Sequence, residues 1–211
     1  AMSGAPRDAY DAGRALHPAD PAGARVWFAR IPASARSQFP RLAYYEAYAA
    51  LDRGVRGAAL EPYDTALERF LATDAGRSYP GAHELASRVA FARGDVERAR
   101  RHADADAQQR SAKARPLLAR AAAALDRSRP DEARAALGEA ARLVPGNERL
   151  AWLEAELAAK SGNEGELAHA FAALREAAPS GAAAVGAENA IRSEHGLPLA
   201  TPSASGESAA Q

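Results

Sequence analysis

Side chains that could carry out acid–base or metal chemistry are thinly spread through this sequence. The five histidines lie far apart in the chain, at His17, His83, His102, His169 and His195. The nearest approach to a ligand cluster is His102 with Asp104 and Asp106, but residues two apart on a helix point to different faces. The sequence therefore predicts no metal site and no cofactor.

Motifs typical of a catalytic centre are also missing from the sequence. The chain has no cysteine, which excludes thiol catalysis, thiolate metal sites and disulfides. It lacks a nucleophile elbow and a phosphate-binding loop, and its carboxylates are scattered. The less regular N-terminal region is the one place where an enzyme site, or an enzyme's helical accessory domain, could be hidden. Its candidate residues are Asp8, Tyr10, His17 and Trp27. We expect a protein that is not an enzyme, with no catalytic residue.

The tripeptide Arg93-Gly94-Asp95 has the sequence of an adhesion signal. The same residues suit a turn between two helices, because a cation is favourable where a helix ends and glycine readily adopts the left-handed conformation. Aspartate is in turn a good N-cap for the next helix. We therefore interpret the tripeptide as a structural turn.

The elements that position these residues are expected to be helices. In this chain of 211 residues alanine is the commonest residue and aromatic residues make up only 6%, a composition that favours helix over sheet. Basic and acidic residues balance at 27 each, so no global field attracts nucleic acid or an anionic membrane. No apolar run approaches the roughly 20 residues of a membrane span. We expect an all-α protein with no nucleic-acid partner and no membrane insertion.

A period of 34 residues organises the second half of the chain. The turn residues Gly94, Ser128 and Gly162 follow one another at this interval. Small and apolar residues recur at helical spacing before and after each turn. Each repeat is therefore predicted to be a hairpin of two helices.

These repeats resemble the tetratricopeptide repeat family over nearly half of the chain. The repeat from 114 to 146 has the family's order of small residue, turn residue, alanine, large apolar residue, alanine and proline: Ala121, Ser128, Ala133, Leu137, Ala140 and Pro145. The repeats at 80–111 and 148–179 match it less completely. The resemblance implies a right-handed α-solenoid of antiparallel helix hairpins, with about 10 to 11 helices in the whole chain.

One position departs from the family pattern. The apolar residue usual in the middle of the first helix is replaced by Arg120 in one repeat and Glu154 in the next. Either these two side chains pair across adjacent repeats, or the first helix is rotated by one residue from this alignment.

The domain organisation follows from the repeats. Residues 1–78 are expected to form divergent helix pairs, and residues 79–179 the three repeats. Residues 180–197 are expected to form a capping helix that ends at Gly196 in the left-handed conformation, because a solenoid needs a terminal cover. The small, polar segment 198–211 is predicted to be disordered.

The resemblance also implies where a partner would bind, since the first helix of each repeat lines the concave face in this family. Tyrosine, arginine and large apolar side chains at such positions could hold a peptide. The candidate binding residues are Arg41, Tyr44, Tyr48, Arg88, Phe91, Arg115, Leu118, Arg149, Trp152 and Glu156. Packing between neighbouring helices is the alternative role for the tyrosines.

The hypothesis for function is a non-enzymatic adaptor or scaffold that binds a peptide or helix of a partner protein on its concave face. The alternative is a structural subunit that assembles or oligomerises in a bacterial envelope or secretion complex. Arginine supplies all but two of the basic residues, Lys113 and Lys160, which we interpret as a trace of GC-rich bacterial coding. The compartment stays open between cytoplasm and periplasm.

Overall fold

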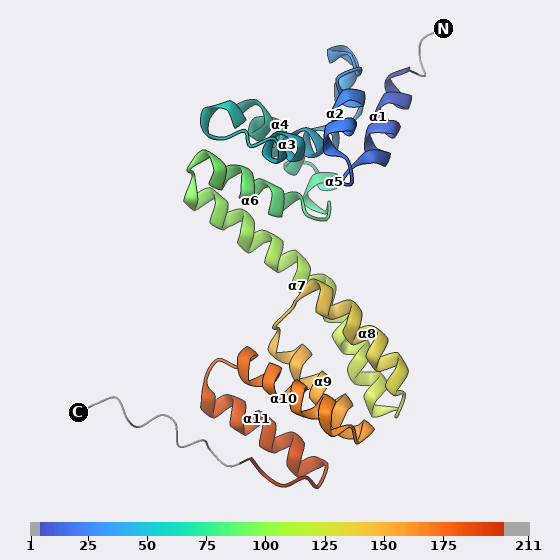
Figure 1. Cartoon of the computed structure of the whole chain (residues 1–211), viewed down its shortest axis with the longest axis vertical. Coiled ribbons are helices and arrows are strands. Elements are labelled where there is room, and N and C mark those ends of the chain that lie inside the picture. The colour runs from blue at the N-terminus through green and yellow to red at the C-terminus, as the bar shows by residue number, and fades with distance from the viewer. Residues whose placement is uncertain (1–4, 201–211) are drawn as a thin grey trace, which may run out of the picture. The chain divides into compact units, whose positions relative to one another are not determined.

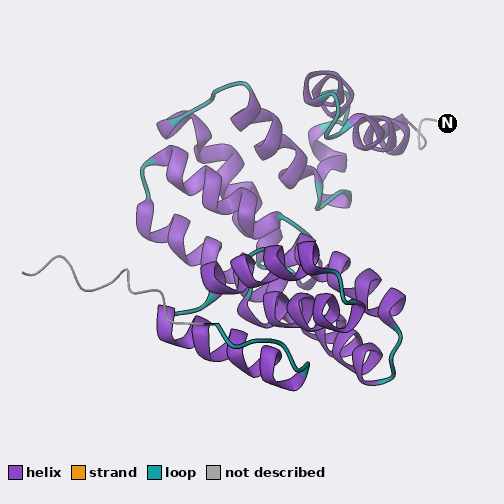
Figure 2. Cartoon of the chain, turned by 60° about the horizontal axis from the view of Figure 1, so that its bottom comes forward, coloured by secondary structure: helices purple, strands orange, loops and turns teal. Residues whose placement is uncertain are grey.

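The protein is all-α, as the composition predicts. The computed structural model describes residues 5–200, and over that range it contains eleven α-helices, two short 3-10 helices and no strand (Figure 1, Figure 2). Most of the tail predicted to be disordered, from residue 201 onward, lies outside the described residues. Within the described range no helix has both the length and the apolar character needed to cross a membrane.

The chain divides into two compact units, residues 1–109 and 110–211. The described part of the N-terminal unit contains six α-helices and two 3-10 helices, and a seventh α-helix begins there. These elements are α1 (Ala5–Leu16), α2 (Pro21–Phe28), η1 (Ala33–Gln38), α3 (Leu42–Asp52), η2 (Gly57–Leu60), α4 (Glu61–Leu71), α5 (Asp74–Arg77), α6 (Ala82–Arg93) and the start of α7 (Val96–Asp126).

The C-terminal unit contains the rest of α7 and four further helices in its described part. These are α8 (Pro130–Leu143), α9 (Glu148–Ser161), α10 (Glu164–Ala177) and α11 (Gly181–Glu194). A helix is present where the capping helix is predicted, as α11. It ends as predicted, because Gly196 has a φ of 65° and the Leu197 N–H donates to the Arg192 carbonyl at 2.7 Å.

Helix α7 is one continuous helix where the repeat boundaries at 111 and 114 imply two. No glycine or asparagine lies between Val96 and Asp126 to provide a left-handed stop. Pro116 is the one strong helix breaker in this stretch, and it lies inside the helix. No turn therefore separates the two segments that the sequence analysis assigned to different helices.

The turn residues that the sequence places 34 residues apart share a left-handed backbone conformation. Gly94, Ser128 and Gly162 all have positive φ angles, of 87°, 55° and 68°. Gly196 lies a further 34 residues along and also has a positive φ. Helix α11 is thus followed by a left-handed residue, as α6 and α9 are.

Each unit has its own core. In the N-terminal unit the aromatic residues Tyr10, Phe28 and Tyr45 gather between α1, α2 and α3, with Phe28 stacked on Tyr45 at 5.4 Å between ring centroids. A second apolar cluster joins α3, α4 and α6. The C-terminal unit is packed instead through alanine and leucine, with Phe171 as its one fully buried aromatic residue among those described.

Candidate functional site

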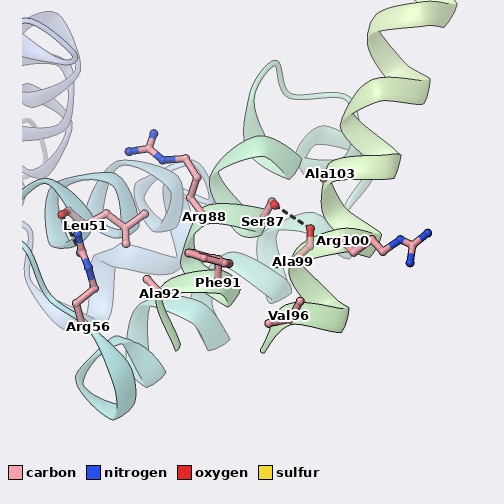
Figure 3. Close-up of a pocket in the computed structure, with 10 residues that line it drawn as sticks. All are labelled: Leu51, Arg56, Ser87, Arg88, Phe91, Ala92, Val96, Ala99, Arg100 and Ala103. Carbon is pink, nitrogen blue, oxygen red and sulfur yellow. Dashed lines mark hydrogen bonds between the residues drawn. The ribbon is translucent and has the colours of Figure 1, made fainter. Parts of the chain in front are cut away.

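An open groove with an apolar floor lies in the N-terminal unit (Figure 3). Its volume is about 750 Å³. The side chains that line it come from the end of α3 and the following loop, from α6 and from the first turns of α7. They are Leu51, Arg56, Ser87, Arg88, Phe91, Ala92, Val96, Ala99, Arg100 and Ala103, and we call this hollow the Phe91 groove.

Two large apolar side chains of the groove face solvent. Phe91 is 68% exposed and Val96 is 62% exposed, although both belong to residue types that normally pack inside. They lie on either side of the turn at Gly94, whose left-handed conformation ends α6 and redirects the chain into α7. The Ser87 hydroxyl donates to the Ala99 carbonyl at 2.7 Å, and this bond fastens α6 to α7 beneath the groove. Phe91 and Val96 are therefore held by two helices that are hydrogen-bonded to each other.

Three arginines border this apolar surface, one from each element of the groove. Arg56 donates to the carbonyls of Leu51 and Val55, at 3.3 and 2.8 Å. The Arg88 guanidinium lies 5.8 Å from the centroid of the Tyr48 ring. Arg100 is exposed. None of the three forms an ion pair with a described carboxylate, and no Asp, Glu or His is among the groove's described lining residues.

Arg88 also borders a second hollow of about 540 Å³ in the same unit, which we call the tyrosine cleft. Four tyrosines, a histidine, two arginines and a glutamate dominate its walls. The lining residues are Arg14, His17, Pro18, Tyr44, Tyr45, Tyr48, Tyr79, Gly81, Glu84, Leu85 and Arg88. The predicted residues Tyr44, Tyr48 and Arg88 are thus brought together at one place.

Burial shifts the pKa of three ring groups in the tyrosine cleft in the direction that favours the neutral form. Burial raises the pKa of Tyr44 and of Tyr45, and for Tyr45 the hydrogen bond with Tyr79 at 3.2 Å between hydroxyl oxygens adds to this. Burial lowers the pKa of His17, whose ring meets Tyr48 edge-on at 4.6 Å between centroids. The His17 Nε2 atom is buried and has no hydrogen-bond partner among the described residues.

The tyrosines have a structural role whether or not they bind a partner. Tyr44 and Tyr48 are half-buried and pack against the apolar cluster of α3, α4 and α6. Tyr44 also contacts the ring of Tyr79 at 5.0 Å between centroids. The packing role that the sequence left open is therefore present, and replacing either ring by alanine would remove core contacts.

Arg41 lies at the start of α3, outside both hollows. It is exposed, and its guanidinium lies 5.2 Å from the centroid of the Tyr79 ring.

The remaining predicted binding residues lie in the C-terminal unit and divide into two groups. Arg115, Leu118 and Arg149 line a hollow of about 590 Å³ formed by α7, the turn before α9 and the start of α9. Trp152 is half-buried between two apolar clusters, and its indole N–H donates to Glu156 at 2.9 Å. Trp152 and Glu156 are thus hydrogen-bonded to each other, and neither of them lines this hollow.

Arg120 and Glu154 do not pair with one another. Arg120 lies 3.3 Å from Glu139 of α8. Glu154 is half-buried, and burial raises its pKa, an effect that the nearby His169 opposes. The first of the two explanations for these charged residues is therefore wrong.

The N-terminal residues considered for an enzyme site do not gather around one cavity. Tyr10 is buried and stacks on Phe39 at 4.7 Å between centroids. Arg30 covers Trp27 at 4.3 Å from the ring centroid, and Asp8 is exposed. His17 is the one member of this set that lines a described hollow.

The tripeptide Arg93-Gly94-Asp95 has the structural roles expected of a turn. Arg93 forms ion pairs with Glu61 and Asp64 of α4. Asp95 accepts a hydrogen bond from the Arg98 N–H at 3.0 Å, which caps α7.

The structure brings together two histidines that the sequence analysis did not predict to be in contact. His83 of α6 and His102 of α7 face each other with 3.1 Å between their Nδ1 atoms, and the His102 Nε2 lies 2.9 Å from a carboxylate oxygen of Glu68. No third ligand joins them in an arrangement that could hold a metal ion within residues 5–200. The available signal was the spacing of Glu68 and His102, which are one 34-residue period apart.

Comparisons with known proteins leave the chain without a family assignment: no protein-family model, no curated protein and no solved structure matches it.

Proposed function

We propose that this protein is a non-enzymatic adaptor, and that it binds a segment of a partner protein in the Phe91 groove. The observation that carries the proposal is the concentration of exposed apolar side chains. Four large apolar residues are exposed within the described chain, at Val26, Phe91, Val96 and Leu199. Two of the four share one groove, whereas scattered single exposures are ordinary.

The groove suits binding better than catalysis. Its lining offers exposed apolar area and guanidinium donors, the two features that recur at protein interaction sites. It offers no side chain that could act as a general base at neutral pH, because its described lining contains no His, Asp or Glu. A catalytic reaction in this groove would therefore lack a side chain to accept a proton.

We propose further that the helices form a tetratricopeptide-like solenoid of antiparallel hairpins, with the groove on its binding face. The 34-residue phase of the left-handed turn residues supports this. Side-chain contacts in the N-terminal unit support it independently, because three of them join residues one period apart. These are Tyr45 with Tyr79, Asp64 with Arg98, and Glu68 with His102.

The test is a quantitative capture experiment with the full chain and its Phe91→Ala variant. Wild-type protein and variant are immobilised at equal density, and the proteins they retain from a bacterial lysate are compared by mass spectrometry. We expect species retained by the wild type to be reduced at least about tenfold on the variant, because a central aromatic residue often dominates an interface. The unfolding midpoint should stay nearly unchanged, since Phe91 is 68% exposed.

Val26→Ala is the matched control. Val26 is 52% exposed on α2 of the same unit, outside the groove, so its removal changes exposed apolar area without touching the site. Equal retention by wild type and Phe91→Ala would refute the groove as the binding site.

Light scattering on the same proteins separates the adaptor from an assembly subunit. The two exposed apolar residues would also suit self-association. A wild-type oligomer that becomes monomeric in Phe91→Ala would replace the adaptor proposal with the assembly role.

A further inference from the structure

We infer that the segment bound in the Phe91 groove is acidic, with side-chain carboxylates on both sides of a large apolar residue that packs on Phe91 and Val96. This inference rests on the proposed function and specifies the chemistry of its ligand.

The charge of the groove points to an anionic partner. Arg56, Arg88 and Arg100 contribute three cations, and the described lining contributes no acidic group. Other arginines of the same helices are matched with carboxylates: Arg93 at the end of α6 pairs with Glu61 and Asp64, and Arg98 of α7 with Asp64 and Asp95. The chain as a whole carries no net charge, so this excess of cations belongs to the lining of the groove and not to the protein in general.

The arrangement of the three cations indicates where the carboxylates of the segment would lie. In Figure 3 Arg88 and Arg56 lie on the Phe91 side of the groove and Arg100 lies on the Val96 side. The Arg56 side chain is turned towards Leu51, and the guanidinium groups of Arg88 and Arg100 point outward from the two apolar side chains. A segment that crosses the groove would therefore meet an apolar centre flanked by guanidinium groups. Its apolar side chain belongs at the centre and its acids at the flanks.

Two of the arginines are already held in place before anything binds. The Arg56 guanidinium is fixed by the Leu51 and Val55 carbonyls, and that of Arg88 lies over the Tyr48 ring. These contacts do not neutralise either charge. Less conformational freedom is lost when a carboxylate binds to a guanidinium that is already oriented.

A protein segment fits the groove better than a nucleic acid does. Phosphates could also meet the arginines, and a base could stack on Phe91. The rest of the floor is aliphatic, however, from Leu51, Ala92, Val96 and Ala99. Such a floor suits the branched or aromatic side chain of a protein, and it offers no second ring on which a further base could stack.

The experiment is a selection from a random library of displayed peptides on the full-length protein, repeated on two triple variants. The first, Arg56→Gln with Arg88→Gln and Arg100→Gln, removes the groove's cations. The matched control, Arg25→Gln with Arg53→Gln and Arg101→Gln, makes the same change of net charge at exposed positions outside the groove. Circular dichroism melting checks that both variants fold.

Wild type and control should enrich peptides in which Asp or Glu flank a large apolar residue, and the groove variant should not enrich the acids. An enriched acidic peptide, measured by fluorescence anisotropy, should bind the groove variant roughly ten- to a hundredfold more weakly than the control. Replacing its Asp and Glu by Asn and Gln should weaken binding to the wild type similarly. Added salt should weaken wild-type binding and leave that of the groove variant nearly unchanged.

The outcomes distinguish this inference from the proposed function. Enrichment of apolar peptides without acids, with binding lost in Phe91→Ala, would overturn the acidic ligand and keep the adaptor. Tighter binding of an oligo-dT strand than of any peptide would overturn the acidic segment in favour of nucleic acid. If no peptide enriched on the wild type depends on Phe91, the groove is not the binding site and both proposals fail.

Discussion

Each of the two units buries one carboxylate against two arginines, but the two arrangements differ in what surrounds them. In the N-terminal unit Asp64 of α4 is 2% exposed and accepts from Arg93 and Arg98. Each of these arginines also has a second carboxylate, Glu61 for Arg93 and Asp95 for Arg98. The result is a network of five charged groups that joins α4, the end of α6 and the start of α7.

In the C-terminal unit the buried carboxylate is Glu188 of α11, which is completely buried. One of its oxygens accepts two hydrogen bonds from Arg175 of α10, at 2.9 and 2.6 Å, and the other accepts from Arg192 at 2.8 Å. Neither arginine has another carboxylate partner among the described residues. Within the described residues this triad therefore has no second carboxylate for its cations, although Arg192 also donates to the Pro198 carbonyl.

The comparison predicts that burial of the carboxylate alone does not determine how much an ion pair contributes to stability. Removing one partner of a buried pair is costly chiefly because the other charge is left uncompensated. In the N-terminal unit Glu61 and Asp95 can still compensate the arginines when Asp64 is lost. In the C-terminal unit nothing described can replace Glu188.

The largest expected effect is therefore that of Glu188→Gln. We expect it to lower the free energy of unfolding of the C-terminal unit by about 3 kcal/mol, and Asp64→Asn to lower that of the N-terminal unit by about 1 to 2 kcal/mol. The chain has two tryptophans, and Trp27 lies in the N-terminal unit and Trp152 in the C-terminal unit. Urea unfolding followed by fluorescence, in Trp152→Phe and Trp27→Phe backgrounds, therefore measures one unit at a time.

The double variant Glu61→Gln with Asp64→Asn provides the internal control. It removes the alternative partner of Arg93, so it should bring the N-terminal unit close to the loss expected for Glu188→Gln. If Asp64→Asn alone lowers the free energy of unfolding as much as Glu188→Gln does, Glu61 and Asp95 do not compensate the charges of the arginines.

The two units also differ in how burial acts on their titrating groups. In the N-terminal unit burial lowers the pKa of His83, and the charge of His102 lowers it further, while Asp106 and Glu68 act in the opposite direction. Burial also lowers the pKa of His17. In the C-terminal unit burial raises the pKa of Glu154 above its ordinary 4.5.

These shifts predict opposite responses to acid. A histidine with a lowered pKa binds fewer protons in the folded than in the unfolded state, so its unit loses stability as pH falls through the ordinary value of 6.5 towards the lowered pKa. A glutamate with a raised pKa binds more protons when folded. It therefore gives its unit stability as pH falls through the raised pKa towards 4.5.

Hydrogen exchange between pH 7 and pH 5 measures this contrast for each helix, after correction for the intrinsic exchange rate. Relative to the wild type, His83→Gln should reduce the acid-induced loss of protection in α6, and Glu154→Gln should remove the acid-induced gain in α9. Parallel changes in both helices for either variant would contradict the assignment of one response to each unit.

The fold could be predicted from the sequence where local chemistry decides it. Left-handed turn residues and N-caps depend on single side chains, so Gly94, Asp95 and Gly162 were assigned correctly. The continuity of α7 could not be predicted in the same way. The 34-residue period describes repeats but does not say whether two of them are separated by a turn, and α7 runs through the expected boundary without one.

The candidate site was predictable only in part. The residues Tyr44, Tyr48, Arg88 and Phe91 could be selected because they lie on helices expected to face a partner, and they do lie around two adjoining hollows. Arg56 and Val96 were missed, because one follows the end of a helix and the other begins the second helix of its pair. Charge pairing decides which arginines are available, and it depends on contacts such as Arg98 with Asp64 that only the packed structure defines.

The smallest expected effect concerns a left-handed turn position that occurs in both units. Ser128 occupies the left-handed position that Gly94 and Gly162 occupy elsewhere, and it is the one non-glycine residue with positive φ among those described. A side chain strains the backbone there, so Ser128→Gly should stabilise the C-terminal unit by about 0.5 to 1 kcal/mol.

The reciprocal variants Gly94→Ser and Gly162→Ser should each destabilise their own unit by a similar amount. A Cβ at either glycine would meet no atom within 4 Å, so the penalty comes from the backbone alone and should be equal in the two units. Urea unfolding with the two tryptophan reporters measures all three variants. A cost for Gly94→Ser clearly different from that for Gly162→Ser would mean that the turns are not equivalent, and that the 34-residue phase does not carry the same local structure through both units.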